Sequence, residues 1–108
     1  MKLTSILRNS FGAAAALMLM GSAPAFAEGP LKIGVAMELS GRFVAYGSSG
    51  KRGAEFALDV YGDKVAGMPI ELVVRDLQSD PQATVSTFNE LVNGIGINYI
   101  IGPIASPI

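Results

Sequence analysis

The chain has 108 residues and a formal net charge of −1, and it contains neither cysteine nor histidine. Without cysteine it can form no disulfide and carry out no thiolate chemistry. Without histidine it lacks the most common metal ligand and the most common general base. Its weak negative charge gives no electrostatic attraction for nucleic acid or an anionic membrane. The composition therefore argues against a hydrolase, a metalloenzyme and a nucleic-acid-binding protein.

The first 27 residues have the pattern of an export signal. Lys2 and Arg8 make the start basic, residues 11–20 are almost wholly apolar, and residues 25–27 (Ala-Phe-Ala) place small side chains at the two positions that a signal peptidase requires. A membrane anchor is disfavoured, because the apolar run is shorter than the roughly 20 residues that span a bilayer. We expect a signal peptide at 1–27, cleaved after Ala27, and a mature chain of residues 28–108.

The mature chain begins with a predicted strand, a loop and a helix. Residues 31–37 form a short apolar run suited to a strand that is buried on both faces, and residues 38–47 have the serine and glycine content of a loop. The helix is predicted from Ser48 or Ser49, which can cap its start, to Gly62. Its expected buried face has helical spacing and consists of Ala54, Ala57, Leu58 and Tyr61.

Two further strands are predicted. Residues 65–69 contain glycine and proline and indicate a turn, and the β-rich residues 70–76 that follow indicate the second strand. Residues 97–101 indicate the third strand, which closes at Gly102 and Pro103.

A second helix is predicted between these two strands. Asp80 and Pro81 mark its start, because an aspartate accepts hydrogen bonds from free backbone N–H groups and proline suits the first helical position. Residues 93–94 (Asn-Gly) mark its end. Its expected buried stripe consists of Val85, Phe88 and Val92, with Leu91 beside them.

The order strand, helix, strand, helix, strand predicts an α/β fold with a parallel sheet and helices over its faces. Open parallel sheets bind ligands beyond the carboxyl ends of their strands, so the loops at 37–47, 76–80 and 102–108 border the expected site. The third strand would be an apolar edge with nothing beside it. We therefore expect the chain to be a truncated chain or a fragment.

Two apparent chemical motifs have simpler explanations. Residues 47–52 suggest a phosphate-binding loop, but Ala45 stands where the first glycine is required and Arg52 stands where serine or threonine is required. A helix N-terminus with solvated charges explains this segment better. Asp76 and Asp80 suggest a carboxylate pair for acid–base chemistry, but a helix cap explains Asp80, and a hydrogen-bond acceptor at a strand end explains Asp76.

Two residues in the predicted loops can face a ligand. Tyr46 can cover an apolar side chain of a ligand while its hydroxyl stays in water, or it can pack on the start of the first helix. The hydroxyl of Ser106 can both donate and accept, which suits the carboxylate or ammonium of a zwitterion, or Ser106 can be an ordinary loop serine. The residues alone leave both alternatives open.

Six short segments of the mature chain share their order and spacing with one known family: residues 32–41 (Lys-Ile-Gly-Val-Ala-Met-Glu-Leu-Ser-Gly), 45–47 (Ala-Tyr-Gly), 53–55 (Gly-Ala-Glu), 71–76 (Glu-Leu-Val-Val-Arg-Asp), 79–81 (Ser-Asp-Pro) and 100–103 (Ile-Ile-Gly-Pro). Behind an export signal, this series resembles the leucine/isoleucine/valine-binding protein family over essentially the whole mature chain. The chain departs from the family at residues 60–69, where the usual Asn-rich, double-glycine turn is replaced by a shorter one.

The resemblance implies that residues 28–108 are the first part of the N-terminal lobe of a type I periplasmic binding protein fold. It also implies a periplasmic protein without catalytic activity or cofactor, which captures branched-chain or related amino acids and delivers them to the membrane permease of an ABC importer. By motif, Tyr46 matches the family's aromatic over the ligand and Ser106 its serine at the polar end of the ligand, with Ile104 beside it. The alternative is the ligand-binding domain of an exported sensor, or a binding protein for another small carboxylate or amide.

Overall fold

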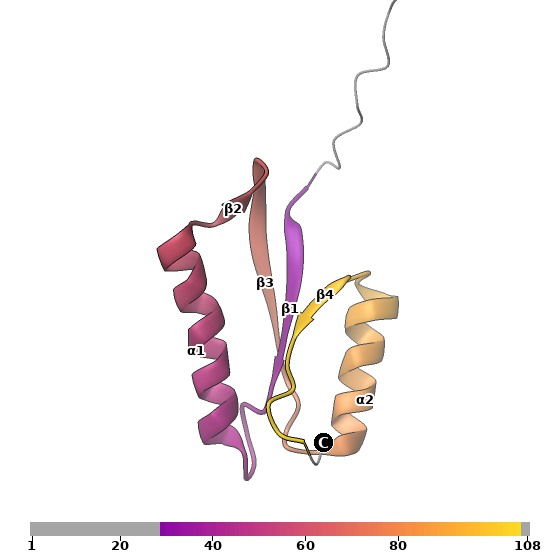
Figure 1. Cartoon of the computed structure of the whole chain (residues 1–108). Helices are drawn as coiled ribbons and strands as arrows, with labels where there is room; N and C mark the ends of the chain where they lie inside the picture. Colours follow the sequence, from indigo (N-terminus) through magenta and orange to yellow (C-terminus); the bar gives the residue numbers. More distant parts are fainter. Residues whose placement is uncertain (1–28, 107–108) are drawn as a thin grey trace, which may run out of the picture.

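The computed structural model describes residues 29–106, so the predicted signal peptide at 1–27 and its cleavage site lie outside the described residues. The described part is a sheet that lies between two helices (Figure 1). Its elements follow one another in this order: β1 (Leu31–Met37), α1 (Val44–Tyr61), β2 (Lys64–Val65), β3 (Met68–Asp76), α2 (Pro81–Asn89), the π-helical turn η1 (Glu90–Gly94) and β4 (Tyr99–Ile101).

Strand β1 is the centre of the sheet. The strand order is β2-β3-β1-β4, and β1 pairs in parallel with both β3 and β4. Its second half, Val35, Ala36 and Met37, is buried, because strands flank it on both sides and helices lie over the sheet. The predicted α/β fold with a parallel βαβαβ sheet is therefore confirmed.

A short antiparallel hairpin stands where the sequence indicated a simple turn at residues 65–69. Lys64 pairs with Pro69 and Val65 with Met68, so β3 begins two residues before the predicted strand. The two connecting residues have positive φ angles of 49° and 79°, which is the conformation that tight two-residue hairpin turns require.

Helix α1 begins at Val44, four residues before the predicted start at Ser48. The backbone N–H of its N-cap residue, Phe43, donates to the hydroxyl of Ser79 over 3.1 Å. Phe43 gives the helix no side-chain cap, and the local serine cap that we predicted is not formed. Ser49 lies inside the helix, where its hydroxyl donates to the carbonyl one turn earlier. The predicted caps are therefore wrong.

The buried face of α1 is also displaced from the prediction. Tyr61 is 87% exposed and Ala57 is exposed, whereas Ala54 and Leu58 are half-buried as expected. The helix ends at Gly62 as predicted, and the Gly62 N–H donates to the Leu58 carbonyl over 2.9 Å. The more buried face of α1 has helical spacing and includes glycines that the apolar pattern did not count: Gly47, Gly50, Ala54 and Leu58.

Helix α2 starts as predicted, but its core-facing stripe lies one step away. The Asp80 carboxylate accepts from the Ala83 N–H over 2.7 Å, which confirms the cap. Leu91 is fully buried and Phe88 packs against the core, whereas Val85 is 63% exposed. Val92 is exposed as well, so the prediction is confirmed for Phe88 and Leu91 and wrong for Val85 and Val92.

The core lies between β1 and α2. Strand β4 is shorter than the predicted segment 97–101, and Ile97 is buried in the loop before it. The buried core cluster consists of Ala36, Leu77, Leu91 and Ile97. Within residues 29–106, neither helix has the length and apolar character needed to cross a membrane.

Two glycines of α1 give a matched test of this packing. A Cβ atom at Gly47 would lie 2.7 Å from the backbone nitrogen of Glu38 and closer still to its carbonyl, whereas a Cβ atom at Gly53 would meet nothing within 4 Å. We expect Gly47→Ala to lower the free energy of unfolding by about 3 kcal/mol through overpacking. Gly53→Ala should raise it by up to about 1 kcal/mol, because alanine favours the helix.

Urea unfolding of the full-length gene product, followed by circular dichroism, measures both variants. Equal effects of the two substitutions would contradict the close approach of α1 to the end of β1.

Candidate ligand-binding site

The carboxyl ends of the parallel strands meet at one edge of the sheet, at the lower end of Figure 1. The loops that leave these ends are residues 38–43, 77–80 and 102–106. This is the edge at which the sequence predicted a ligand site. Side-chain oxygens from Glu38 and Asp76 tie the loops to one another there.

Glu38 joins the loop after β1 to the loop after β4. Its side chain is fully buried. One carboxylate oxygen accepts from the Ala105 N–H over 3.1 Å, and the other accepts from the Ile104 N–H over 3.3 Å. A buried carboxylate is stable only where such donors replace water. No local pattern in the sequence indicates this role of Glu38, because its partners lie 66 and 67 positions away.

Asp76 joins the loop after β3 to the loop after β1. A single carboxylate oxygen accepts from the N–H groups of Leu39 (2.9 Å), Ser40 (3.2 Å) and Gln78 (2.8 Å). The prediction that Asp76 serves as a hydrogen-bond acceptor at a strand end is confirmed. Ser79 adds a further tie, because its hydroxyl donates to the Ser40 carbonyl over 2.7 Å.

A depression of about 290 Å³ lies on this edge, between the start of α1 and the loop after β4. All three predicted site residues line it, Tyr46 from α1 and Ile104 and Ser106 from the loop after β4. Tyr46 lies in the first turn of α1 and not in a loop as expected, and it is 64% exposed. Ala105 completes the wall on the side of Ser106.

Phe43 also lines the depression, and sequence reasoning missed it. It lies one helical turn from Tyr46, so the two aromatic residues belong to the same wall. The guanidinium of Arg42 lies 4.6 Å from the centre of the Phe43 ring, which is the geometry of a cation–π contact. Phe43 stands three residues before Tyr46, which is the spacing of one helical turn. A correct prediction of the start of α1 would have placed the two aromatic residues on the same side of the helix.

Ile104 fits against α1 because Gly50 has no side chain. A Cβ atom at Gly50 would overlap the tip of Ile104 and lie 2.9 Å from the end of the Met37 side chain. The apolar floor of this edge is therefore built from β1, α1 and the loop after β4 together.

The arrangement has the chemistry of a binding site. Aromatic and aliphatic walls suit the apolar part of a small solute, and one serine hydroxyl suits its polar group. Within residues 29–106, no group of three or more Asp or Glu side chains is placed to hold a metal ion.

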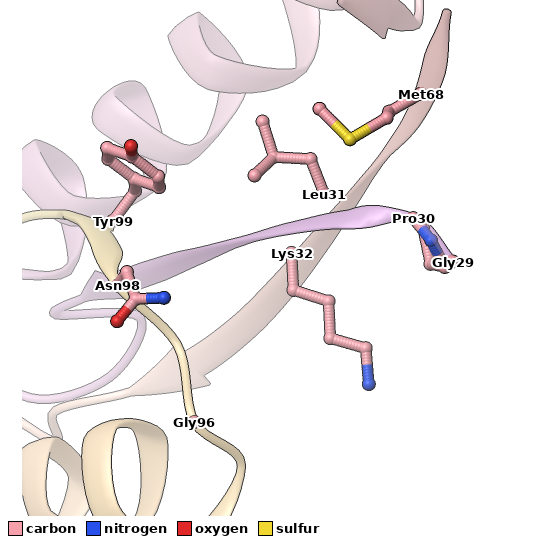
Figure 2. A pocket seen from close by; sticks show the side chains of 8 residues that line it. All are labelled: Gly29, Pro30, Leu31, Lys32, Met68, Gly96, Asn98 and Tyr99. Atoms are coloured by element: carbon pink, nitrogen blue, oxygen red, sulfur yellow. The ribbon is translucent and has the colours of Figure 1, made fainter. Parts of the chain in front are cut away.

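A second hollow, of about 220 Å³, lies at the opposite, amino end of the sheet (Figure 2). Leu31, Met68 and Tyr99 lie on one side of β1 there, and Lys32 points to the other side. None of the residues predicted for the site lines this hollow, whereas Tyr46, Ile104 and Ser106 all line the depression at the carboxyl end. The carboxyl-end depression is therefore the better candidate.

Comparison with known proteins identifies the family. The sequence profile described as "Periplasmic binding protein" matches residues 30–108. The chain is 34% identical over 82 residues to the Leu/Ile/Val-binding protein BraC3 of Rhizobium johnstonii, covering 74% of this chain and 22% of that protein. It is 32% identical over 90 residues to the Leu/Ile/Val-binding protein homolog 6 of Brucella abortus, covering 82% of this chain and 23% of that protein.

Solved structures agree. The branched-chain amino acid transporter substrate-binding protein LivJ of Streptococcus pneumoniae, in complex with isoleucine, matches with a TM-score of 0.64 and 32% identity over 68% of this chain and 22% of that one. A solute-binding protein of a Rhodopseudomonas palustris ABC transporter, in complex with 4-hydroxybenzoate, matches with a TM-score of 0.66 and 30% identity over 72% and 22%.

The chain therefore belongs to the periplasmic binding protein family, and its relatives are substrate-binding proteins of ABC transporters. The predicted resemblance is confirmed. The chain spans less than a quarter of the length of the curated relatives named above.

The Asp76 tie predicts a specific acid sensitivity. Burial raises the pKa of Asp76, but hydrogen bonds from Ser40 and from the backbone N–H groups of Gln78 and Leu39 together lower the pKa below its ordinary value. A lowered folded-state pKa contributes stability that is present above the unfolded value of about 3.9 and is lost as the pH falls through the folded pKa. We expect the free energy of unfolding to fall below about pH 4, and less steeply in Asp76→Asn.

Urea unfolding across this acid range, for the wild type and Asp76→Asn, measures the difference. Identical pH dependence in the two proteins would show that the Asp76 hydrogen bonds do not stabilise the loops.

Proposed function

We propose that this chain is the first part of the N-terminal lobe of an ABC importer's substrate-binding protein, which captures a branched-chain or related amino acid in the periplasm and delivers it to the membrane permease. The observation that carries this proposal is the meeting of Tyr46, Ile104 and Ser106 in one depression at the carboxyl edge of the sheet. Membership of the family and the predicted export signal support it.

Each of the three residues has a distinct role on this proposal. The Tyr46 ring covers the apolar side chain of the ligand, and Ile104 forms the apolar wall on the other side. The Ser106 hydroxyl bonds the carboxylate or ammonium at the polar end. LivJ in complex with isoleucine, and the Leu/Ile/Val-binding proteins among the relatives, support an aliphatic amino acid.

Transport follows from closure of two lobes. The depression is open and its aromatic wall is largely exposed, which suits half of a cleft. An opposing lobe would supply the remaining contacts, and the ligand would favour the closed state because both sets of contacts exist only there. The closed protein then docks on the permease.

A second ligand class, small aromatic carboxylates, is favoured by one observation. Phe43 adds a second aromatic ring to the lining beside Tyr46, and an aromatic lining suits a flat ligand. The R. palustris neighbours in complex with 4-hydroxybenzoate and with benzoate support this alternative. Isoleucine and the benzoates share a carboxylate, so Ser106 has the same role for both.

Thermal melting of the mature full-length gene product tests the proposal with two ligand sets, Leu, Ile and Val in one and benzoate and 4-hydroxybenzoate in the other. A ligand that binds only the native state adds about 2.7 kcal/mol of stability at a concentration of 100 Kd. We expect one set to raise the Tm, and Ser106→Ala to reduce the shift. Ser86→Ala, on the exposed surface of α2, is the matched control and should keep the full shift.

A shift from the amino acids alone supports the main proposal, and a shift from the benzoates alone supports the second. If neither set raises the Tm, or if Ser106→Ala keeps the full shift, the proposed ligands or the proposed site are wrong.

A further inference from the structure

Glu38 is the one fully buried polar or charged side chain among residues 29–106. Ionisable side chains are rarely buried unless they are paired. The ion pairs of the described part of the chain are Lys51–Glu55 and Arg75–Glu90, and Glu38 belongs to neither. Its carboxylate bonds instead to two backbone N–H groups, those of Ile104 and Ala105.

The loop that carries Ile104 and Ser106 depends on this carboxylate. Within the described residues, no backbone–backbone hydrogen bond is formed by residues 102–106 outside the sheet, and the two bonds to Glu38 are the side-chain hydrogen bonds that they make. An apolar side chain would fill the same buried position at a lower desolvation cost. A carboxylate is needed there only if the two N–H groups must be held in place.

Glu38 also lies against α1, the helix that carries Tyr46 on the other wall of the depression. Its backbone lies directly against Gly47, the residue that follows Tyr46 in α1. Its backbone therefore fixes the position of the Tyr46 wall, and its side chain fixes the Ile104–Ala105 wall. One residue sets the distance between the two walls.

We propose that Glu38 is a positioning residue of the binding site: its carboxylate holds the backbone at Ile104 and Ala105 so that Ile104 and Ser106 face Tyr46 at the distance that the ligand requires. This role rests on the proposed function of the depression. Glu38 does not itself line the depression, so it acts on the ligand through the loop.

The test uses Glu38→Gln and Glu38→Asp in the full-length gene product. Glutamine keeps the shape but places an amide N–H₂ against one of the backbone N–H groups. Aspartate keeps the charge but is one carbon too short to reach both groups, and it serves if the glutamine variant fails to fold. The matched control is Asp80→Ala, which removes the cap of α2; the hydrogen bonds of Asp80 within residues 29–106 go to Leu77, Ala83 and Thr84 and not to the 102–106 loop.

Two readouts separate positioning from general destabilisation. We expect the amide hydrogen exchange of Ile104 and Ala105 to become at least about tenfold faster in the Glu38 variants, as a lost hydrogen bond to a charged group implies. We expect the Kd for isoleucine or for 4-hydroxybenzoate, whichever the wild type binds, to rise about tenfold or more. Asp80→Ala should leave both quantities within about twofold of the wild type.

The proposal is overturned if exchange at Ile104 and Ala105 is unchanged in the Glu38 variants, or if their Kd rises no more than in Asp80→Ala. If the wild type binds neither probe, the proposed function fails on its own. The exchange rates then still decide whether Glu38 holds the loop: faster exchange supports that part of the proposal, and unchanged exchange overturns it.

Discussion

The structure depends on carboxylates that satisfy backbone N–H groups at the carboxyl edge of the sheet. Glu38 holds the loop after β4, and Asp76 holds the loops after β1 and β3. Buried backbone donors must be paired, and loops at this edge offer few backbone partners. Together with the Ser79 hydroxyl and the bond from the Leu77 N–H to the Met37 carbonyl, these two side chains hold the three loops in place. The depression lies between the start of α1 and the loop that Glu38 holds.

The features that the sequence predicted correctly have local or general causes. The apolar runs of β1 and β3 indicate buried strands, and their alternation with helices leads to a parallel sheet. The Asp80 cap is a contact between residues three positions apart. The general rule for parallel sheets pointed to the carboxyl edge, where Tyr46, Ile104 and Ser106 do lie together, and their role in binding a ligand stays a prediction.

The features that the sequence did not predict depend on partners far along the chain. Local serines suggested a later start for α1, whereas the residue before its first turn, Phe43, bonds to Ser79, 36 positions away. The buried face of α1 is set by glycines that allow close approach, and a hydrophobic pattern gives glycines no weight. The burial of Glu38 requires the N–H groups of Ile104 and Ala105, which no local pattern connects to it.

The most direct test of the account is to locate the ligand on the molecule. Titration of the ¹⁵N-labelled full-length gene product with isoleucine, and separately with 4-hydroxybenzoate, gives chemical-shift changes for each backbone amide. We expect the largest changes within residues 29–106 at Phe43, Tyr46 and residues 104–106. Changes concentrated instead at residues 29–32, 68 and 96–99, around the hollow of Figure 2, would contradict it.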